Sequence, residues 1–284
     1  VFLCDVGAYG SSLSSNYNLR PKSPEILINR SKIKVLKKRQ RLENIIWFLI
    51  KMIRNTFFLF FFFLGIIFIS ILFLPSLLLP NKVVLFGGKI FGYWSVFCLK
   101  IFLNTKLEIK GKENIIKNTK FFIASSHQSM FETFFLQTIF NSPKFILKYE
   151  LLKIPVFGWY LSKIGSISVN RNKISKDNLG LLDKIKTASE KSNRPIIIFP
   201  QGTRVLPDER IPFKKGVGRI YNELNIKCQP VAINSGTVWP KKGSLKPNKK
   251  ITISILEPVN PGLNPADFIN LIETRIYSEL DKMN

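Results

Sequence analysis

The chain has 284 residues, and its 43 Lys or Arg residues outweigh 18 Asp or Glu residues to give a formal charge of +25 at pH 7. This charge favours an anionic partner, such as a phospholipid surface, a phosphorylated substrate or a nucleic acid. Three widely spaced cysteines and one histidine exclude a disulfide framework and a histidine-rich metal centre, and they indicate no zinc site.

The first 44 residues are predicted to form a basic, poorly ordered region. Residues 1–29 contain scattered Ser, Asn, Pro and Gly, show no apolar periodicity and lack the pattern of a signal peptide. From Arg30 to Arg41 the chain is strongly basic. A solvated tail would explain this charge, but the position just before an apolar segment favours contact with anionic lipid.

A membrane-anchoring helical region is predicted for residues 45–106. No charged residue lies between Arg54 and Lys82, and this run is longer than the roughly 18 apolar residues that suggest a membrane helix. A second apolar segment, residues 83–103, is interrupted by lysines, and its uncharged runs are too short to span a bilayer. Basic residues are denser before the first segment, which favours a cytoplasmic N-terminus. We expect a two-segment hairpin, which keeps the following domain in the cytoplasm.

Residues 107–284 are predicted to form an α/β domain. Short β-rich runs alternate with helical stretches, which is typical of a largely parallel or mixed sheet flanked by helices. The expected strands are 121–124, 145–148, 166–169, 195–199, 230–234 and 251–256. The expected helices are 129–140, 150–164, 176–191, 215–224 and 265–283.

The single histidine, His127, follows the first of these strands. Its imidazole is the side chain suited to acid–base chemistry near neutral pH. Within one helix, His127 and Glu132 would point about 140° apart, so they meet only if the histidine lies in a loop and the glutamate in the first helical turn. Ser129-x-x-Glu132 has the form of a capping box that would start a helix there. Glu132 is therefore expected to cap the helix, to orient His127, or to do both.

A carboxylate beside one imidazole nitrogen fixes the tautomer and stabilises the imidazolium, so that the other nitrogen can take a proton from a hydroxyl. Ser126 and Ser129 are close in sequence, but neither lies in a G-x-S-x-G motif. The hydroxyl that loses its proton to the imidazole is therefore expected to belong to the substrate and not to a serine of the chain.

Two later strand ends carry an arginine. Gly202, Thr203 and Arg204 follow the strand at 195–199 in a turn whose amides, hydroxyl and guanidinium would bind phosphate. Arg171 follows the strand at 166–169. Taken alone, each arginine is also compatible with a solvated surface position.

The order of these segments resembles the glycerolipid acyltransferase family, in particular the 1-acyl-sn-glycerol-3-phosphate acyltransferases. The similar segments are His127-x4-Glu132, Val169-Asn170-Arg171, Phe199-Pro200-Gln201-Gly202-Thr203-Arg204 and the run 230–236, and the resemblance covers residues 107–257 plus the apolar N-terminal region. It implies that His127 is a general base supported by Glu132. It also implies that lysophosphatidate is bound by Arg171, Gly202, Thr203 and Arg204, with Lys148, Gln201 and Pro230 as candidate further contacts.

The resemblance implies transfer of a fatty acyl group from acyl-CoA or acyl carrier protein to the sn-2 hydroxyl of 1-acyl-glycerol-3-phosphate, which gives phosphatidic acid. It implies direct transfer without an acyl-enzyme, a metal or another cofactor, on the cytoplasmic face of a membrane (the inner or plasma membrane in a bacterium). Glu132 replaces the usual aspartate of the first motif, and Gln201 replaces the usual glutamate of the third.

Two alternatives remain open. One is an acyltransferase that acts on a different lysolipid or on an amine-containing acceptor. The other is a non-enzymatic basic membrane protein that binds anionic lipid. Nucleic acid is not expected as a partner, because no nucleic-acid-binding motif is present and the lysines are spread along the chain.

Overall fold

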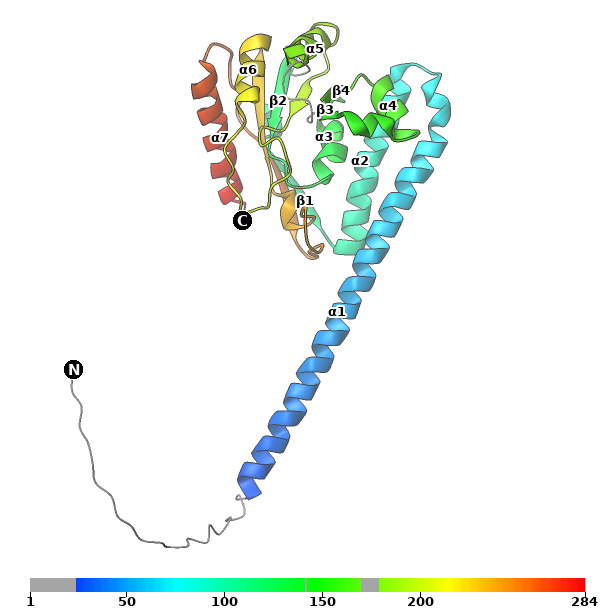
Figure 1. Cartoon of the computed structure of the whole chain (residues 1–284), viewed down its shortest axis with the longest axis vertical. Coiled ribbons are helices and arrows are strands. Elements are labelled where there is room, and N and C mark those ends of the chain that lie inside the picture. Colours follow the sequence, from blue (N-terminus) through cyan, green and yellow to red (C-terminus); the bar gives the residue numbers. More distant parts are fainter. Residues whose placement is uncertain (1–23, 141, 170–178, 284) are drawn as a thin grey trace, which may run out of the picture. The chain divides into compact units, whose positions relative to one another are not determined.

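The structure is a computed structural model that describes residues 24–140, 142–169 and 179–283 (Figure 1). The chain falls into two compact units, residues 1–51 and residues 52–284. Helix α1 (Pro24–Leu72) begins in the first unit and ends in the second.

The described residues of the first unit all belong to α1. The prediction that residues 1–44 are poorly ordered is wrong for residues 24–44, which are helical, and residues 1–23 lie outside the described residues. Residues 24–44 are helical because the segment is rich in Lys, Arg, Leu and Ile, most of which have favourable helix propensities. Arg39 also pairs with Glu43 one turn later, at 3.0 Å.

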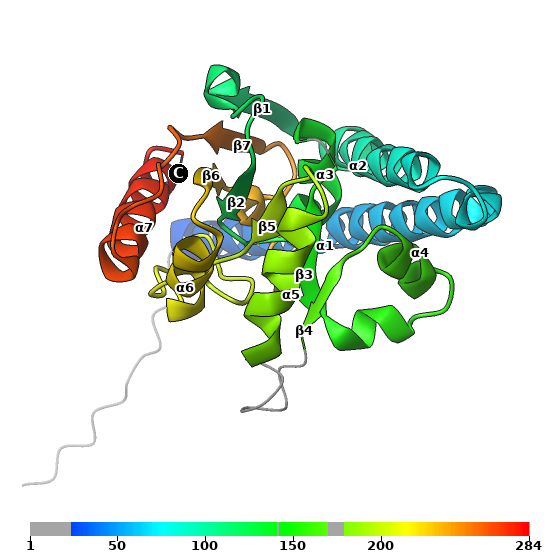
Figure 2. The same cartoon turned by 90° about the horizontal axis from the view of Figure 1, so that it is seen from above.

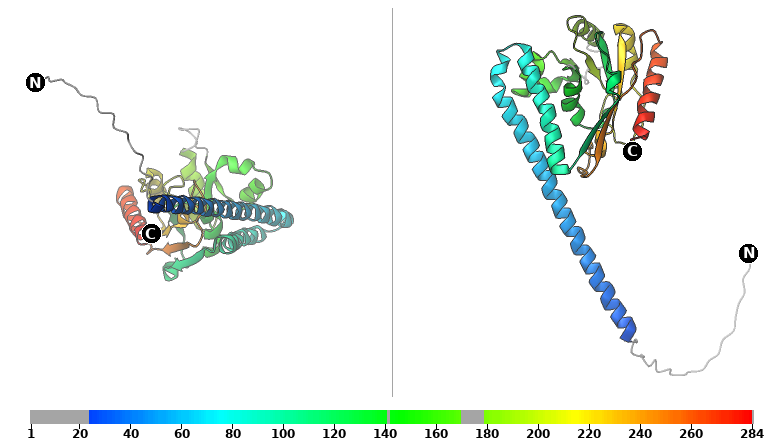
Figure 3. Two further views of the ribbon diagram at one scale, coloured as in Figure 1. Left: turned by 90° about the horizontal axis from the view of Figure 1, so that it is seen from below. Right: turned by 180° about the vertical axis from the view of Figure 1, so that it is seen from behind.

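The second unit begins with a helical hairpin. After α1 ends, a 3₁₀ turn, η1 (Leu74–Leu77), leads into α2 (Asn81–Leu103), which returns beside the last part of α1 (Figures 1 and 3). The indole N–H of Trp94 donates to the carbonyl oxygen of Phe62 across the two helices, at 3.3 Å. The hairpin forms as predicted. By length and composition, both helices could cross a membrane. The expectation that residues 83–103 are too short to span does not hold by this criterion, because α2 is one continuous helix that includes Lys89 and Lys100.

The α/β domain contains a seven-stranded sheet with the order β1-β7-β6-β2-β5-β3-β4. The strands are β1 (Lys106–Lys110), β2 (Phe121–Ser125), β3 (Lys144–Lys148), β4 (Ile167–Val169), β5 (Ile196–Ile198), β6 (Lys227–Ile233) and β7 (Lys250–Ile255). Neighbouring strands are parallel except β6 and β7, which are antiparallel. The predicted mixed sheet is confirmed. The edge strand β1 was not predicted, because its sequence, KLEIK, is dominated by charge.

The helices of the domain follow the strands in the predicted alternation. They are α3 (Phe131–Ile139), α4 (Phe157–Lys163), α5 (Leu179–Glu190), α6 (Lys215–Leu224) and α7 (Pro265–Asp281), with 3₁₀ turns η2 (Lys112–Asn114), η3 (Tyr149–Lys153) and η4 (Ser235–Thr237). The single helix expected at 150–164 is instead η3 followed by α4. Pro155 separates them because it lacks the N–H that a continuous helix needs.

Two hydrophobic cores lie on opposite faces of the sheet. Helices α2 and α3 cover one face, and α5, α6 and α7 cover the other (Figure 2). Successive residues of β2 alternate between them, so that Ile123 belongs to the first core and Phe122 to the second. The carboxyl ends of the parallel strands β2, β3 and β5 meet at one edge, where open α/β sheets bind ligands.

Candidate active site

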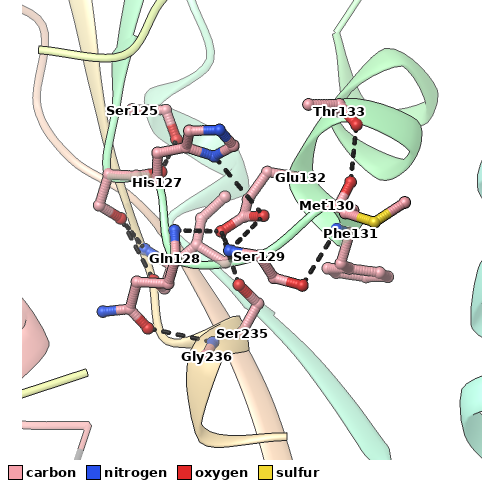
Figure 4. Close-up of polar contacts among 12 residues, drawn as sticks. Ser125, His127, Gln128, Ser129, Met130, Phe131, Glu132, Thr133, Ser235 and Gly236 are labelled. Carbon is pink, nitrogen blue, oxygen red and sulfur yellow. Dashed lines mark hydrogen bonds and ion pairs between the residues drawn. The ribbon is translucent and has the colours of Figure 1, made fainter. Parts of the chain in front are cut away.

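His127 and Glu132 lie where strand β2 passes into helix α3 (Figure 4). His127 is in the loop and Glu132 is in the first turn of the helix. The Nδ1 atom of His127 lies 3.9 Å from the Oε2 atom of Glu132. This is the distance of an ion pair and is longer than a hydrogen bond. The division between loop and helix, which the capping-box pattern predicts, brings the two side chains together.

Glu132 has no exposed surface, and its carboxylate is held by three residues. Its Oε1 atom accepts from the N–H of Gln128 at 2.8 Å, the N–H of Ser129 at 3.0 Å and the hydroxyl of Ser235 at 2.6 Å. The hydroxyl of Ser129 in turn accepts from the N–H of Phe131 at 3.2 Å. The glutamate half of the capping box is therefore present, whereas the hydroxyl of Ser129 accepts from Phe131 rather than from the N–H of Glu132, and the residue that precedes the helix is Met130. Glu132 caps the helix and faces His127 at the same time.

Burial raises the pKa of the Glu132 carboxyl from its ordinary value of 4.5 to about 7. The hydroxyl of Ser235 and the N–H groups of Gln128 and Ser129 act in the opposite direction, because they donate to the ionised form. With a pKa of about 7, the carboxyl beside His127 is balanced between its protonated and ionised forms near neutral pH, because burial favours the first and the three donors favour the second.

This raised pKa predicts how stability depends on pH. The folded state binds a proton at Glu132 more tightly than the unfolded state, so the contribution of Glu132 to stability is complete below pH 4.5 and is lost as the pH rises through about 7. We expect this contribution to the free energy of unfolding to fall by at most about 1.4 kcal/mol per pH unit in that window. Urea unfolding of the wild type and of Glu132→Gln from pH 4 to 8.5 measures it. Identical pH slopes in the two proteins would contradict the prediction.

The backbone of His127 is held by the loop that follows β5. Its N–H donates to the side-chain oxygen of Gln201 at 3.1 Å, and its carbonyl oxygen accepts from the N–H of Val205 at 2.9 Å. The imidazole ring stacks on Phe199, with ring centroids 4.0 Å apart. The predicted first and third motifs are thus joined directly. Gln201 has no exposed surface and its side-chain oxygen holds the backbone of His127, so a contact of Gln201 with substrate stays a prediction.

The Gln201→Ala substitution is expected to lower activity by about 100-fold, because small displacements of a reacting group have effects of this size. It leaves the buried N–H of His127 without an acceptor, which costs about 1–3 kcal/mol of stability. Gln201→Glu keeps an acceptor oxygen at the same position and is the matched control. Initial rates and unfolding midpoints of both variants measure this. An active Gln201→Ala variant would show that the bond does not position His127.

The serines near His127 are structural. The hydroxyl of Ser126 accepts from the N–H of Ile233 at 2.8 Å and so ties β2 to β6. Neither Ser126 nor Ser129 has any exposed surface, so neither can reach a substrate. This agrees with the expectation that the attacking hydroxyl belongs to the substrate.

The segment after β6 completes the surroundings of Glu132. Ser235 lies in η4 and supplies the hydroxyl to Glu132, and the N–H of Gly236 donates to the side-chain oxygen of Gln128 at 3.1 Å. A Cβ atom at Gly236 would lie 2.9 Å from the Cβ of Gln128, so a larger residue does not fit there. Pro230 is buried within β6, opposite Ala124 of β2, and its contact with substrate stays a prediction.

A cavity of about 550 Å³ opens beside His127. Of the predicted phosphate-binding residues, Gly202, Thr203, Arg204 and Lys148 line it. Gly202 has a φ of +71°, a conformation that favours glycine and turns the chain toward the cavity. Lys148 also pairs with Glu150 at 3.1 Å. Arg171 lies outside the described residues, although Val169 at the end of β4 lines the same cavity.

Two further cations at this cavity were missed from the sequence. Lys214 precedes α6, and Lys241 lies in the loop after η4. The Nζ atom of Lys241 donates to the hydroxyl of Thr203 at 3.1 Å. Nothing distinguishes these two lysines from the many others in the sequence, because only the fold brings them to His127.

The rest of the cavity wall is mostly apolar. The hairpin contributes Phe73, Val84 and Phe91, and the segment around α4 contributes Phe157 and Leu161. Among the described residues, no group of three or more His, Cys, Asp or Glu side chains could hold a metal ion. The cavity therefore joins a cationic region at His127 to an apolar region beside the hairpin.

Comparison with known proteins agrees with this arrangement. The acyltransferase family model matches residues 106–234. A 1-acyl-sn-glycerol-3-phosphate acyltransferase of Helicobacter pylori is 31% identical over 162 residues, which are 55% of this chain and 67% of that protein. The chain belongs to the acyltransferase family. The family region includes β1 to β6 and the loops that hold His127 and Gly202.

Other members of the acyltransferase family show similar coverage. A 1-acyl-sn-glycerol-3-phosphate acyltransferase of Pseudomonas aeruginosa is 33% identical over 155 residues, or 54% of this chain and 59% of that protein. The matched part is thus about three fifths of that relative. The crystal structure of PlsC, the 1-acyl-sn-glycerophosphate acyltransferase of Thermotoga maritima, has the same fold, with a TM-score of 0.68 and 23% identity over 82% of this chain and 98% of that one.

Proposed function

We propose that the protein transfers an acyl group from a thioester to the sn-2 hydroxyl of 1-acyl-glycerol-3-phosphate, which gives phosphatidic acid. The observation that carries this proposal is the His127–Glu132 pair beside a cavity with a cationic and an apolar region. Curated relatives that are 24–33% identical are named for this reaction, which supports it.

In this mechanism His127 is the general base. Its Nδ1 atom faces Glu132, and its Nε2 atom lies on the far side of the ring (Figure 4). Nε2 takes the proton of the substrate hydroxyl as the hydroxyl oxygen attacks the thioester carbonyl. The new carbon–oxygen bond forms, the carbon–sulfur bond breaks, and the proton on His127 passes to the leaving thiolate. The carboxylate of Glu132 stabilises the imidazolium between these steps.

The cationic region is proposed to bind the phosphate of the acceptor. Arg204 offers a planar fork of donors, and Thr203 and Lys241 lie together beside it. Lys214 and Gly216 at the N-terminal end of α6 also line the cavity, where helix N–H groups favour an anion. Arg171 stays a predicted phosphate ligand. An acceptor with a phosphate monoester fits this region better than a neutral or amine-containing one.

The apolar region is proposed to hold an acyl chain. Its walls come from the hairpin and from α3 and α4, so a chain bound there would lie beside the helices that could enter a membrane. We propose that the domain works at the cytoplasmic face of a membrane, because acyl-CoA and acyl carrier protein are cytoplasmic. Either thioester is compatible with this site.

The test is an assay of the purified full chain in mixed micelles with labelled lysophosphatidate and either acyl-CoA or acyl carrier protein as donor. We expect phosphatidic acid from at least one donor. Lysophosphatidylcholine and monoacylglycerol, which lack a phosphate monoester, are expected to react at least about 10-fold more slowly, because they place no phosphate monoester against Arg204, Lys214 and Lys241. Salt-sensitive lipid binding without turnover would instead support the non-enzymatic alternative.

A further inference from the structure

The segment formed by η3 and α4, residues 149–163, exposes several large apolar side chains. The exposed fractions are 44% for Tyr149, 44% for Ile154 and 55% for Trp159. Single exposed apolar residues are common on soluble proteins, but a cluster of them marks a surface that contacts a partner. We call these three side chains, together with Lys153, the α4 surface.

The composition of the α4 surface is that of a membrane–water interface. Trp and Tyr are enriched where a bilayer meets water, and Lys keeps its charge in water while its stem covers apolar groups. The Nζ atom of Lys153 lies 5.4 Å from the ring centroid of Tyr149. The acid of this segment, Glu150, is paired with Lys148. The charge of the surface therefore suits an anionic lipid headgroup.

The α4 surface is attached to the turn of the helical hairpin. The hydroxyl of Tyr160 donates to the carbonyl oxygen of Ser70 at 2.7 Å, and the Nζ atom of Lys163 donates to that of Leu77 at 2.8 Å. Figures 1 and 2 show α4 beside the end of the hairpin. Leu78 in this turn is 92% exposed. A bilayer that meets the turn therefore meets α4 as well.

The opposite side of the same segment forms part of the cavity wall. Leu151, Phe157 and Leu161 of this segment line the cavity, as does Phe73 at the hairpin turn. One short segment thus has lipid-compatible side chains on its surface and apolar cavity residues within. This continuity connects the membrane side of the domain to the apolar region of the site.

We propose that the α4 surface is a second membrane-contacting element, separate from the helical hairpin, which inserts into the headgroup and upper acyl region of a phospholipid bilayer. It holds the apolar end of the cavity against the lipid. The contact itself does not depend on the reaction, whereas its use for substrate entry rests on the proposed function.

The test places an environment-sensitive fluorophore at position 154 of the full chain. Cys98 and Cys228 are buried, so Ile154→Cys in a Cys4→Ser background is labelled selectively. The matched control is Leu263→Cys, which has a similar exposed fraction, 39% against 44%, and lies just before α7 on the other face of the sheet (Figure 2). Vesicles of phosphatidylcholine with phosphatidylglycerol are the probe. We expect a blue shift and quenching by lipids brominated near the headgroup at position 154 but not at 263. Equal responses at both positions would overturn the proposal.

A second variant separates this proposal from the reaction. Ile154→Ser combined with Trp159→Ser is expected to lower transfer to long-chain lysophosphatidate in vesicles by at least about 10-fold, because each apolar side chain removed weakens insertion. Transfer to a short-chain, micelle-free lysophosphatidate is expected to be unchanged. A fluorescence response without turnover on either substrate would contradict the proposed function alone. Equal loss on both substrates would contradict the role of the α4 surface.

Discussion

His127→Ala is expected to lower the rate of acyl transfer to lysophosphatidate by about 10²–10⁴-fold, the usual contribution of a general base. The fold should survive this change. The bonds that hold residue 127, from its N–H to Gln201 and from the N–H of Val205 to its carbonyl, are made by the backbone and remain in an alanine variant. The imidazole itself contributes a stacking contact with Phe199.

Initial rates under saturating donor, with unfolding midpoints measured in the same detergent, test this prediction. The matched control is Lys186→Ala, which removes an exposed ion pair with Glu223 on the α5–α6 side of the domain and is expected to leave both quantities nearly unchanged. Wild-type activity in the His127→Ala variant would rule out His127 as the base.

Glu132→Gln is expected to lower activity by a similar factor, about 10²–10⁴-fold, for a different reason. The Oε1 atom of Glu132 accepts from three donors and Oε2 from one, the N–H of Ser129 at 3.1 Å, so the amide oxygen of glutamine is expected to take the Oε1 position. The amide nitrogen then replaces Oε2 and faces Nδ1 of His127. It would donate to Nδ1, which leaves the proton on Nε2. In that tautomer Nε2 cannot accept the proton of the substrate.

The same geometry separates catalysis from capping. Glu132→Gln keeps the acceptor for Gln128, Ser129 and Ser235, so its stability should change little. Glu132→Ala removes that acceptor and is expected to cost about 1–3 kcal/mol for each buried donor left unpaired. The pH–rate profile is the decisive readout. Wild-type activity should rise with pH through about 7 as Glu132 ionises, and the glutamine variant should lose this dependence. Parallel losses of activity and stability in Glu132→Gln would mean that the residue only caps the helix.

Local patterns predicted the elements that hold the site. The β-rich runs predicted six of the seven strands in the sheet, and the capping box predicted that the chain changes from loop to helix between His127 and Glu132. These predictions hold because hydrophobic periodicity and helix capping depend on residues a few positions apart. Where charge interrupts the pattern, as in β1, or where proline breaks it, as at Pro155, the local prediction fails.

The same dependence on nearby residues explains why the contact between Gln201 and His127 was not predicted from the sequence. From sequence Gln201 was a polar residue in a phosphate-binding turn, next to Gly202. In the fold its side-chain oxygen accepts from His127, 74 positions away, and its surface is fully buried. Such a contact depends on which strands become neighbours, since β2 and β5 bring their following loops together only because they pair in parallel. Adjacent residues of one turn thus have opposite roles, with Gly202 at the cavity and Gln201 behind the histidine.

The sequence by itself determined the apolar hairpin, the mixed α/β domain and the identity of His127 as the one imidazole available for acid–base chemistry. Only the tertiary structure decided which residues surround His127 and Glu132. Ser235 reaches Glu132 across 103 positions, and Lys241 reaches Thr203 across 38. The reason is physical: a helix start is specified by its own neighbours, whereas a buried carboxylate and a cationic cavity are specified by strand order. The geometry of the His127–Glu132 pair therefore depends on the loops that follow β5 and β6, which supply Gln201 and Ser235.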